Sequence, residues 1–306
     1  MSIGTVGAGG LVTEWTTIRE SRKIFEDEAV LALDKPVGVS VMGERHDTDL
    51  VSMARDAGEE LFPAHRIDKV TSGVVLFAKE LRFHGDLTRQ FNRRTVEKTY
   101  LALTRTRGLP ALATIDLPLS VGRKNRVRIA ANRADIVAWP GPAGTPTPDG
   151  PAGTPGSDGT PGSDGPAGSG ARGPASWTVP AARTFPNVRS YPSVTRIARV
   201  WEGAEHTLVA AYPISGRRHQ IRVHLAWVGH PIEGDPLFDR APVTRTFLHS
   251  WRLSFDAAWD DGRRTHAEAT PGADFWSSLG AEEAAAAAAA LTASTLAPTP
   301  TPTPAP

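Results

Sequence analysis

One stretch of the chain joins a charged turn to an apolar run: His65-Arg66-Ile67-Asp68-Lys69-Val70-Thr71-Ser72-Gly73-Val74-Val75-Leu76-Phe77-Ala78. The five apolar residues from Val74 onward predict a buried strand, because they directly follow Ser-Gly turn residues. An aspartate in the turn before a strand can be held rigidly, and neighbouring cations keep its carboxylate ionised. Capping a turn is nevertheless the commoner use of an Asp in such a sequence, so Asp68 alone does not establish a site.

Patterns elsewhere predict further strands and only a few helices. Strands are expected at residues 29–33, 99–104 and 206–212. Helices are expected over residues 81–94, where Phe83, Leu87 and Phe91 share one face, and from Ser215 to about Val228. Because strands dominate, we expect an α+β fold: a single catalytic domain on a mixed, largely antiparallel sheet with a few flanking helices.

Low-complexity segments divide the chain. Residues 139–176 are rich in Gly and Pro, with Gly at every third position from Gly150 to Gly168. A collagen triple helix needs three chains and many more triplets, so we expect a disordered insert in a surface loop. The Ala- and Thr-Pro-rich residues 281–306 are expected to form a disordered tail. Residues 1–24 are expected to be a partly disordered N-terminal extension, which leaves a catalytic domain at 25–270.

Composition excludes several kinds of chemistry. The chain has no cysteine, which excludes disulfides, thiolate nucleophiles and Cys-ligated metals. No run of 18 apolar residues exists and the N-terminus has no secretory pattern, so we expect a cytoplasmic protein without a membrane span. We also expect a monomer. Residues 89–133 hold eleven Lys or Arg and only two acidic residues. Such an excess suits a phosphate backbone, although a solvated basic face is the commoner explanation of a charge run.

Two more clusters contain candidate functional residues. Tyr100 stands within the expected strand Thr99–Thr104 and could stack on a base, although a core tyrosine is the commoner reading. The second cluster is Ser215-Gly216-Arg217-Arg218-His219-Gln220-Ile221-Arg222-Val223-His224-Leu225. Cations in the first turns of a helix oppose its dipole, which favours binding of an anion. Arg222 adjoins the apolar stripe and is expected to need a carboxylate partner.

A zinc site built from the nearby histidines was weighed as an alternative. His219, His224 and His230 are five and six residues apart. Unlike an i, i+4 pair, these spacings do not place the imidazoles on one helix face. We therefore expect no metal.

Taken together, the clusters resemble the RluA family of pseudouridine synthases. The matching motifs occur in the family's order: Asp34–Gly38, His65–Asp68 with Thr71–Gly73 and Phe77–Lys79, Lys98–Ala102, Gly216–His224, Gly229–Ile232, Gly234–Leu237, Leu248–Ser250 and Leu253–Phe255. Ile67 stands where the family usually has Leu, which a core tolerates. No S4 RNA-binding domain is recognisable, and the 139–176 insert falls at a variable connection of the family.

The resemblance implies isomerisation of specific uridines in structured RNA, ribosomal or transfer, to pseudouridine without a cofactor. It implies that Asp68 is the nucleophile, that Arg222 pairs with it, and that Tyr100 stacks on the flipped target base. Substrate contacts are expected from His65, Arg66, Arg217, Arg218, His219, Gln220 and Ile221.

Two other functions fit parts of the same sequence. One alternative is a catalytically inactive RNA-binding module, which the presence of Asp68, Tyr100 and Arg222 disfavours. The other, a glycoside hydrolase, needs a second positioned acid. Neither Glu97, beside Lys98, nor Glu233 in a Pro-Gly turn supplies it convincingly.

Overall fold

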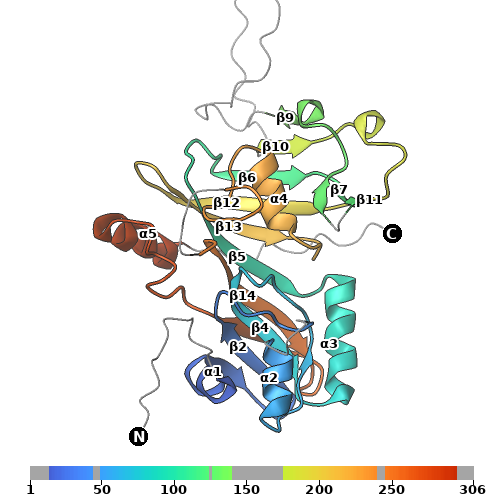
Figure 1. Ribbon diagram of the computed structural model, residues 1–306, viewed down its shortest axis with the longest axis vertical. Coiled ribbons are helices and arrows are strands. Elements are labelled where there is room, and N and C mark those ends of the chain that lie inside the picture. Colours follow the sequence, from blue (N-terminus) through green and yellow to red (C-terminus); the bar gives the residue numbers. More distant parts are fainter. Residues whose placement is uncertain (1–13, 44–48, 124–125, 140–174, 240–244, 295–306) are drawn as a thin grey trace, which may run out of the picture. The chain divides into compact units, whose positions relative to one another are not determined.

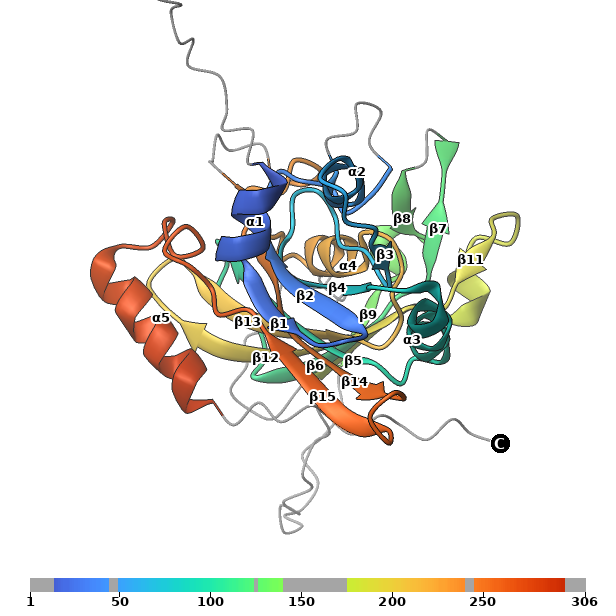
Figure 2. The ribbon, with the colours of Figure 1, turned by 90° about the horizontal axis from the view of Figure 1, so that it is seen from below.

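The computed structural model describes residues 14–43, 49–123, 126–139, 175–239 and 245–294. By its internal contacts the chain divides into two compact units. The first unit contains residues 1–96 and 252–270, and the second contains residues 97–251 and 271–306. Figures 1 and 2 show the elements of both. None of the helices in the described ranges is long and apolar enough to cross a membrane.

The first unit is built on an antiparallel sheet centred on β4. Its strands are β1 (Lys23–Glu26), β2 (Val30–Lys35), β3 (Phe62–Pro63), β4 (Ser72–Ala78) and β15 (Arg263–Glu268). Both β2 and β3 pair with β4, and β15 pairs with the part of β14 (Leu248–Ala257) that begins at Arg252. Its helices are α1 (Trp15–Ser21), α2 (Leu50–Asp56) and α3 (Leu81–Arg93). Every residue of β4 is buried, and Leu87 of α3 packs into the same core as Leu76.

The second unit contains a larger sheet in the order β5-β13-β12-β6-β10-β9. Its strands are β5 (Glu97–Thr104), β6 (Leu112–Asp116), β9 (Val137–Trp139), β10 (Ala175–Thr178), β12 (Val194–Glu202) and β13 (Thr207–Pro213). The pairings are antiparallel except for that of β10 with β6. A small sheet has the order β11-β7-β8, with β7 (Leu119–Val121), β8 (Val127–Ile129) and β11 (Ser190–Tyr191). The helices are α4 (Gln220–Trp227) and α5 (Ala281–Ala293), with short 3-10 turns η2 (Arg133–Asp135) and η3 (Ala181–Arg183).

The expected α+β class with a mostly antiparallel sheet is confirmed. The strands expected at 29–33, 74–78, 99–104 and 206–212 correspond to β2, β4, β5 and β13, and the first expected helix to α3. Most of the 139–176 insert lies outside the described residues, whereas Trp139 belongs to β9 and Ala175 to β10. The insert therefore adjoins strands that pair with each other.

Both ends of the described chain contain structure that the sequence analysis did not expect. Residues 15–24 were assigned to a partly disordered extension, but they form α1 and the start of β1, and Trp15 and Ile18 are buried. Residues 281–293 were assigned to a disordered tail, but they form α5. This helix is fixed by burial of Ala287 and Leu291 in a core of the second unit.

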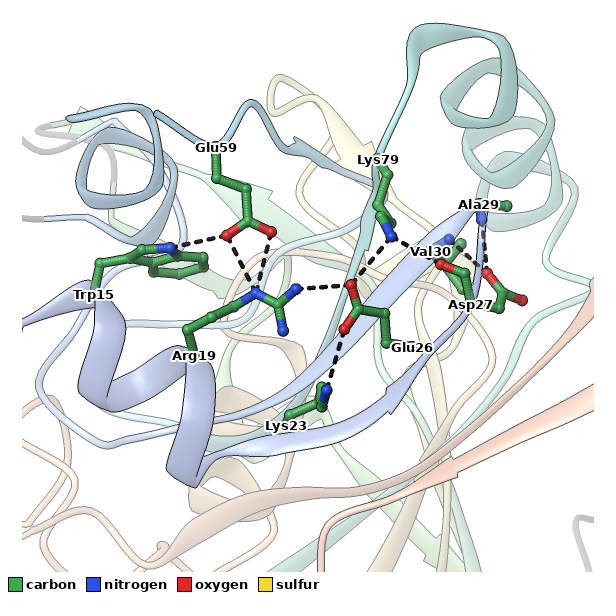
Figure 3. A network of polar contacts seen from close by, with 9 residues as sticks. All are labelled: Trp15, Arg19, Lys23, Glu26, Asp27, Ala29, Val30, Glu59 and Lys79. Carbon is green, nitrogen blue, oxygen red and sulfur yellow. Dashed lines mark hydrogen bonds and ion pairs between the residues drawn. The ribbon is translucent and has the colours of Figure 1, made fainter. Parts of the chain in front are cut away.

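A polar network attaches α1 to the sheet of the first unit (Figure 3). The indole Nε1 of Trp15 donates to Glu59 over 2.9 Å, and the Arg19 guanidinium donates to both Glu59 and Glu26. The ammonium of Lys79, just after β4, also donates to Glu26 over 3.1 Å. The carboxylates of Glu26 and Glu59 thus join α1 and β1 to the segment after α2 and to the end of β4.

Replacement of Glu26 is expected to give a pH-dependent loss of stability. Hydrogen bonds from Arg19, and then from Lys79 and Lys23, lower the pKa of Glu26 from 4.5 to about 2 against the opposing effect of burial. A folded-state pKa below the unfolded value stabilises the protein above pH 4.5, and this stabilisation is lost as the pH falls towards 2. Glu26→Gln should cost about 1–2 kcal/mol at pH 7, because each partly exposed ion pair contributes up to about 1 kcal/mol.

Urea unfolding of the wild type and Glu26→Gln across this pH range measures the effect. The exposed Glu28→Gln is the matched control. A difference between wild type and Glu26→Gln that stays constant down to pH 2 would contradict the assignment.

Candidate functional site

Asp68 lies in the first unit, in the turn between β3 and β4. The backbone N–H of Thr71 donates to the carbonyl oxygen of Asp68 over 3.0 Å, which closes the turn. Gly73 follows with a φ of 104°, a region that residues with a Cβ avoid. Ile67 is buried, Asp68 is half-buried and Arg66 is exposed. The turn therefore anchors the Ile67 side chain in the core, directly before the half-buried Asp68.

A fully buried lysine holds this turn against the loop after β2. The Lys35 ammonium donates to the carbonyl oxygens of Pro36 and Val39 over 2.8 and 2.6 Å, and lies 3.4 Å from that of Lys69. The backbone N–H of Gly38 donates to the same carbonyl of Lys69 over 2.8 Å. Lys35 thereby fixes the residue directly after Asp68.

Removal of the Lys35 ammonium is expected to destabilise the turn. Lys35→Met should lower the free energy of unfolding by about 2–4 kcal/mol, because hydrogen bonds to a charged group contribute about 1.5–3 kcal/mol and their loss leaves the partly buried carbonyls of Pro36 and Val39 without this donor. Urea unfolding measures this, with the exposed Lys23→Met as control. A loss as small as that of Lys23→Met would show that Lys35 does not hold the turn.

The imidazole of His65 is fixed within the first unit. Its Nε2 accepts the backbone N–H of Leu76 over 3.1 Å, and its ring stacks on Phe91 of α3 with centroids 4.7 Å apart. His65 therefore joins the Asp68 turn to both β4 and α3, a structural task that the sequence did not reveal.

Tyr100 and α4 belong to one core of the second unit. Tyr100 stands on β5 opposite Ala211 of β13, is half-buried, and packs against the cluster that contains Ile221 and Leu225. The same face of β5 carries the buried Ala102. The strand therefore fixes the tyrosine ring on the side of the sheet that α4 covers.

Residues 215–219 form a turn before α4 rather than the first turn of the helix. Helix α4 begins at Gln220, after His219 with a positive φ of 55°. The Gln220 Oε1 accepts from the Ser215 hydroxyl over 2.7 Å and from the Arg217 backbone N–H over 3.1 Å. The expected helix start at Ser215 was wrong, because this side chain closes a turn instead. Arg217 and the adjacent Arg218 are exposed ahead of the helix.

Gln220 and Ile221 are buried, with 4% and 6% of their surface exposed. The Gln220 amide nitrogen donates to the Val194 carbonyl over 2.9 Å and to the Thr195 hydroxyl over 3.0 Å. Their observed contacts thus hold the start of α4 against β12.

Arg222 forms a buried ion pair that the sequence analysis did not identify. Its Nε donates to Asp235 Oδ2 over 2.7 Å and its Nη2 to Oδ1 over 2.5 Å. Asp235 is fully buried, and its Oδ1 also accepts the backbone N–H of Leu237 over 2.9 Å. The expectation that Arg222 needs a carboxylate partner is confirmed. The sequence motif Gly234–Leu237 contains this partner, but no role was predicted for Asp235.

The histidines considered for zinc have other contacts. His224 Nδ1 lies 2.9 Å from the Thr195 hydroxyl and Nε2 lies 3.0 Å from the Leu117 carbonyl oxygen. His230 Nδ1 lies 2.6 Å from the Thr106 hydroxyl. Burial lowers the pKa of each to about 4, so both are neutral at pH 7. In the described ranges, no three His, Asp or Glu side chains gather as metal ligands would.

The candidate residues thus fall into two sets. His65, Arg66 and Asp68 belong to the first unit, and Tyr100 and the residues from Arg217 to Arg222 belong to the second. Tyr100 lies on β5 and Arg222 on α4, whereas Asp68 and Arg217 lie in turns that directly precede β4 and α4. Attachment to these elements favours the positional rigidity that a catalytic group needs.

Comparison with known proteins matches the chain to one family. Residues 29–227 match the family described as RNA pseudouridylate synthase. The chain is 29% identical to the dual-specificity RNA pseudouridine synthase RluA of Vibrio vulnificus, over 79% of this chain and 78% of that protein. It is 30% identical to ribosomal large subunit pseudouridine synthase C of Pasteurella multocida, over 78% of this chain but 60% of that protein. The structure of human RNA pseudouridylate synthase domain containing 4 shares the fold, with a TM-score of 0.59 at 19% identity over 88% of this chain and 95% of that one. The chain belongs to the RluA family of RNA pseudouridine synthases.

Proposed function

We propose that the chain isomerises specific uridines of structured ribosomal or transfer RNA to pseudouridine, with Asp68 as nucleophile and after the target base has flipped out. One observation carries the proposal: the family match over residues 29–227 includes Asp68, Tyr100 and Arg222 together. The relatives are themselves named as RNA pseudouridine synthases. The proposal requires no cofactor, because the reaction is an isomerisation.

The reaction rearranges bonds within one nucleotide. The bond between uracil N1 and C1′ breaks, the uracil rotates, and C5 bonds to C1′. The proton on C5 is then lost and N1 gains one, so the atoms balance without an added reactant. Asp68 can add to the base, add to the sugar, or remove the C2′ proton, and each route uses an ionised carboxylate held in place.

The other residues have proposed roles around this carboxylate. Arg222 pairs with Asp68 and keeps it charged, while Tyr100 stacks on the target base and assists removal of the C5 proton. Arg66 helps to fill the space that the flipped base leaves, since unstacking costs a few kcal/mol. We propose substrate contacts from His65, Arg217, Arg218 and His219, with Gln220 and Ile221 shaping the same surface.

The observed contacts support several of these roles. The turn of Asp68 is fixed by Lys35 and Thr71. Arg217 and Arg218 are exposed, as phosphate-binding groups must be. Asp235 already neutralises Arg222 through two hydrogen bonds, so in this proposal Arg222 is shared between two carboxylates.

The proposed compartment is the cytoplasm and the proposed oligomeric state is a monomer.

Mapping of pseudouridines in RNA from cells with and without the gene tests the proposal and identifies the target. We expect one or a few uridines in ribosomal or transfer RNA to lose modification in the deletion strain and to regain it with the wild-type gene. Restoration by an Asp68→Asn gene would contradict the role of Asp68. Identical maps in both strains, on every RNA class, would contradict the proposed function.

A further inference from the structure

The second unit folds two basic, acid-free segments against each other. The sequence has no Asp or Glu from Leu117 to Arg133 and none from Thr178 to Trp201. Strand β7 pairs with β8 within the first segment and with β11 of the second. The backbone N–H of Phe185 donates to the Ala130 carbonyl over 2.8 Å, which extends the junction. The fold thus concentrates positive charge on one small sheet.

Guanidinium groups lie over one aromatic ring on this sheet and over one beside it. The Arg189 guanidinium carbon lies 5.1 Å from the centroid of the Tyr191 ring, and that of Arg217 lies 5.0 Å from the same centroid. The Arg128 guanidinium lies 5.6 Å from the centroid of the Phe185 ring. Residues from three distant parts of the sequence therefore meet around two rings.

These arginines are not used in ion pairs of the fold. Among the described residues, no carboxylate pairs with Arg128, Arg189 or Arg217, and all three side chains belong to exposed residues. By contrast, the nearby Arg183 lies 3.8 Å from Asp135. Unneutralised arginines that are held near one another repel, which favours an anionic ligand.

Tyr191 is itself fixed to the core. It pairs with Leu119 of β7, a residue that is 2% exposed, and its carbonyl accepts the hydroxyl of Ser193 over 2.9 Å. An arginine held over a ring by a cation–π contact still has guanidinium N–H groups for a bidentate contact with a phosphate. The ring therefore positions two arginine edges from two different loops.

We propose that Arg128, Arg189 and Arg217, which lie over the rings of Phe185 and Tyr191, form a clamp for RNA phosphates, in which Tyr191 is a positioning residue. The phosphates belong to nucleotides that flank the modified one, so the inference rests on the proposed function for the identity of the ligand. RNA fits better than an acidic protein because its phosphates are regularly spaced and its bases can stack on guanidinium planes.

Fluorescence anisotropy with a fluorescein-labelled, unmodified RNA hairpin that has uridines in its loop tests the clamp over a range of KCl concentrations. Arg189→Ala should weaken binding about tenfold, because it removes one charge-assisted contact with a phosphate. It should also reduce the slope of log K against log salt by about 0.7–0.9. Tyr191→Leu should have a similar effect, and Tyr191→Phe should bind like the wild type.

Arg82→Ala is the control: Arg82 lies 4.4 Å from the Phe83 ring centroid and is 68% exposed, but it pairs with Glu80 and belongs to the first unit. Wild-type affinity and salt slope in Arg189→Ala would overturn the clamp, and this exposed substitution tests it even if Tyr191→Leu fails to fold. Competition by polyglutamate as strong as that by RNA at equal charge would also overturn it. The assay needs no turnover: a chain that binds through the clamp but forms no pseudouridine would contradict the proposed function alone.

Discussion

Asp68→Asn is expected to abolish pseudouridine formation while the chain still folds and binds RNA. The amide is nearly isosteric with the carboxylate but cannot act as a nucleophile or as a base, so turnover should fall by on the order of a thousandfold or more. The turn should persist, because the backbone N–H of Thr71 donates to the backbone carbonyl of residue 68, which the substitution leaves in place. Single-turnover isomerisation and hairpin anisotropy, measured on the same preparation, separate the two effects.

Asp56→Asn provides the control, since Asp56 is an exposed aspartate of the first unit at the end of α2. It should retain wild-type turnover. If the turnover of Asp68→Asn stays within about tenfold of the wild type, Asp68 is not the nucleophile. A parallel loss of RNA binding would instead show that Asp68 serves the substrate-binding surface.

Asp235→Ala is expected to cause the largest loss of stability among the substitutions considered. It leaves the Arg222 guanidinium buried with its principal observed counter-charge removed. Breaking a buried pair from one side costs about 3–5 kcal/mol, mainly because a charge remains in an apolar surrounding. Urea unfolding followed by far-ultraviolet circular dichroism measures the change.

The double variant Arg222→Met with Asp235→Leu separates stability from catalysis. Replacement of both partners by apolar groups of similar volume should recover most of the stability, but turnover should stay low if Arg222 also serves Asp68. A stable double variant with wild-type turnover would contradict the catalytic role of Arg222. A cost below about 1 kcal/mol for Asp235→Ala would contradict the buried pair itself.

The central strands could be predicted from sequence because their apolar runs reflect burial on both faces. All of β4 is buried, and β2 and β13 are nearly so. The N-terminal helix α1 was missed because only Trp15 and Ile18 anchor its seven residues, and its network reaches Glu59, 40 positions beyond Arg19. Helix α5 was missed because the Ala run that indicates low complexity also packs closely against a sheet.

The site shows the same limit. Asp68, Tyr100 and Arg222 could be identified only because their motifs occur together in family order, since each has a common structural explanation on its own. The pairing of Arg222 with Asp235 depends on a chain reversal after α4, which no local pattern specifies. Tyr191 gave no signal either, because its importance arises from two arginines that the fold brings to one ring.

The most direct test uses the purified chain and unmodified RNA labelled with tritium at C5 of uridine. Formation of pseudouridine replaces the C5 proton by a bond to C1′, so each turnover releases one tritium into water. With transcripts of transfer RNA and of large-subunit ribosomal RNA, we expect release to match pseudouridine formed at one or a few positions, without any added metal or cofactor. No release from either RNA class by the folded wild-type chain would contradict the account.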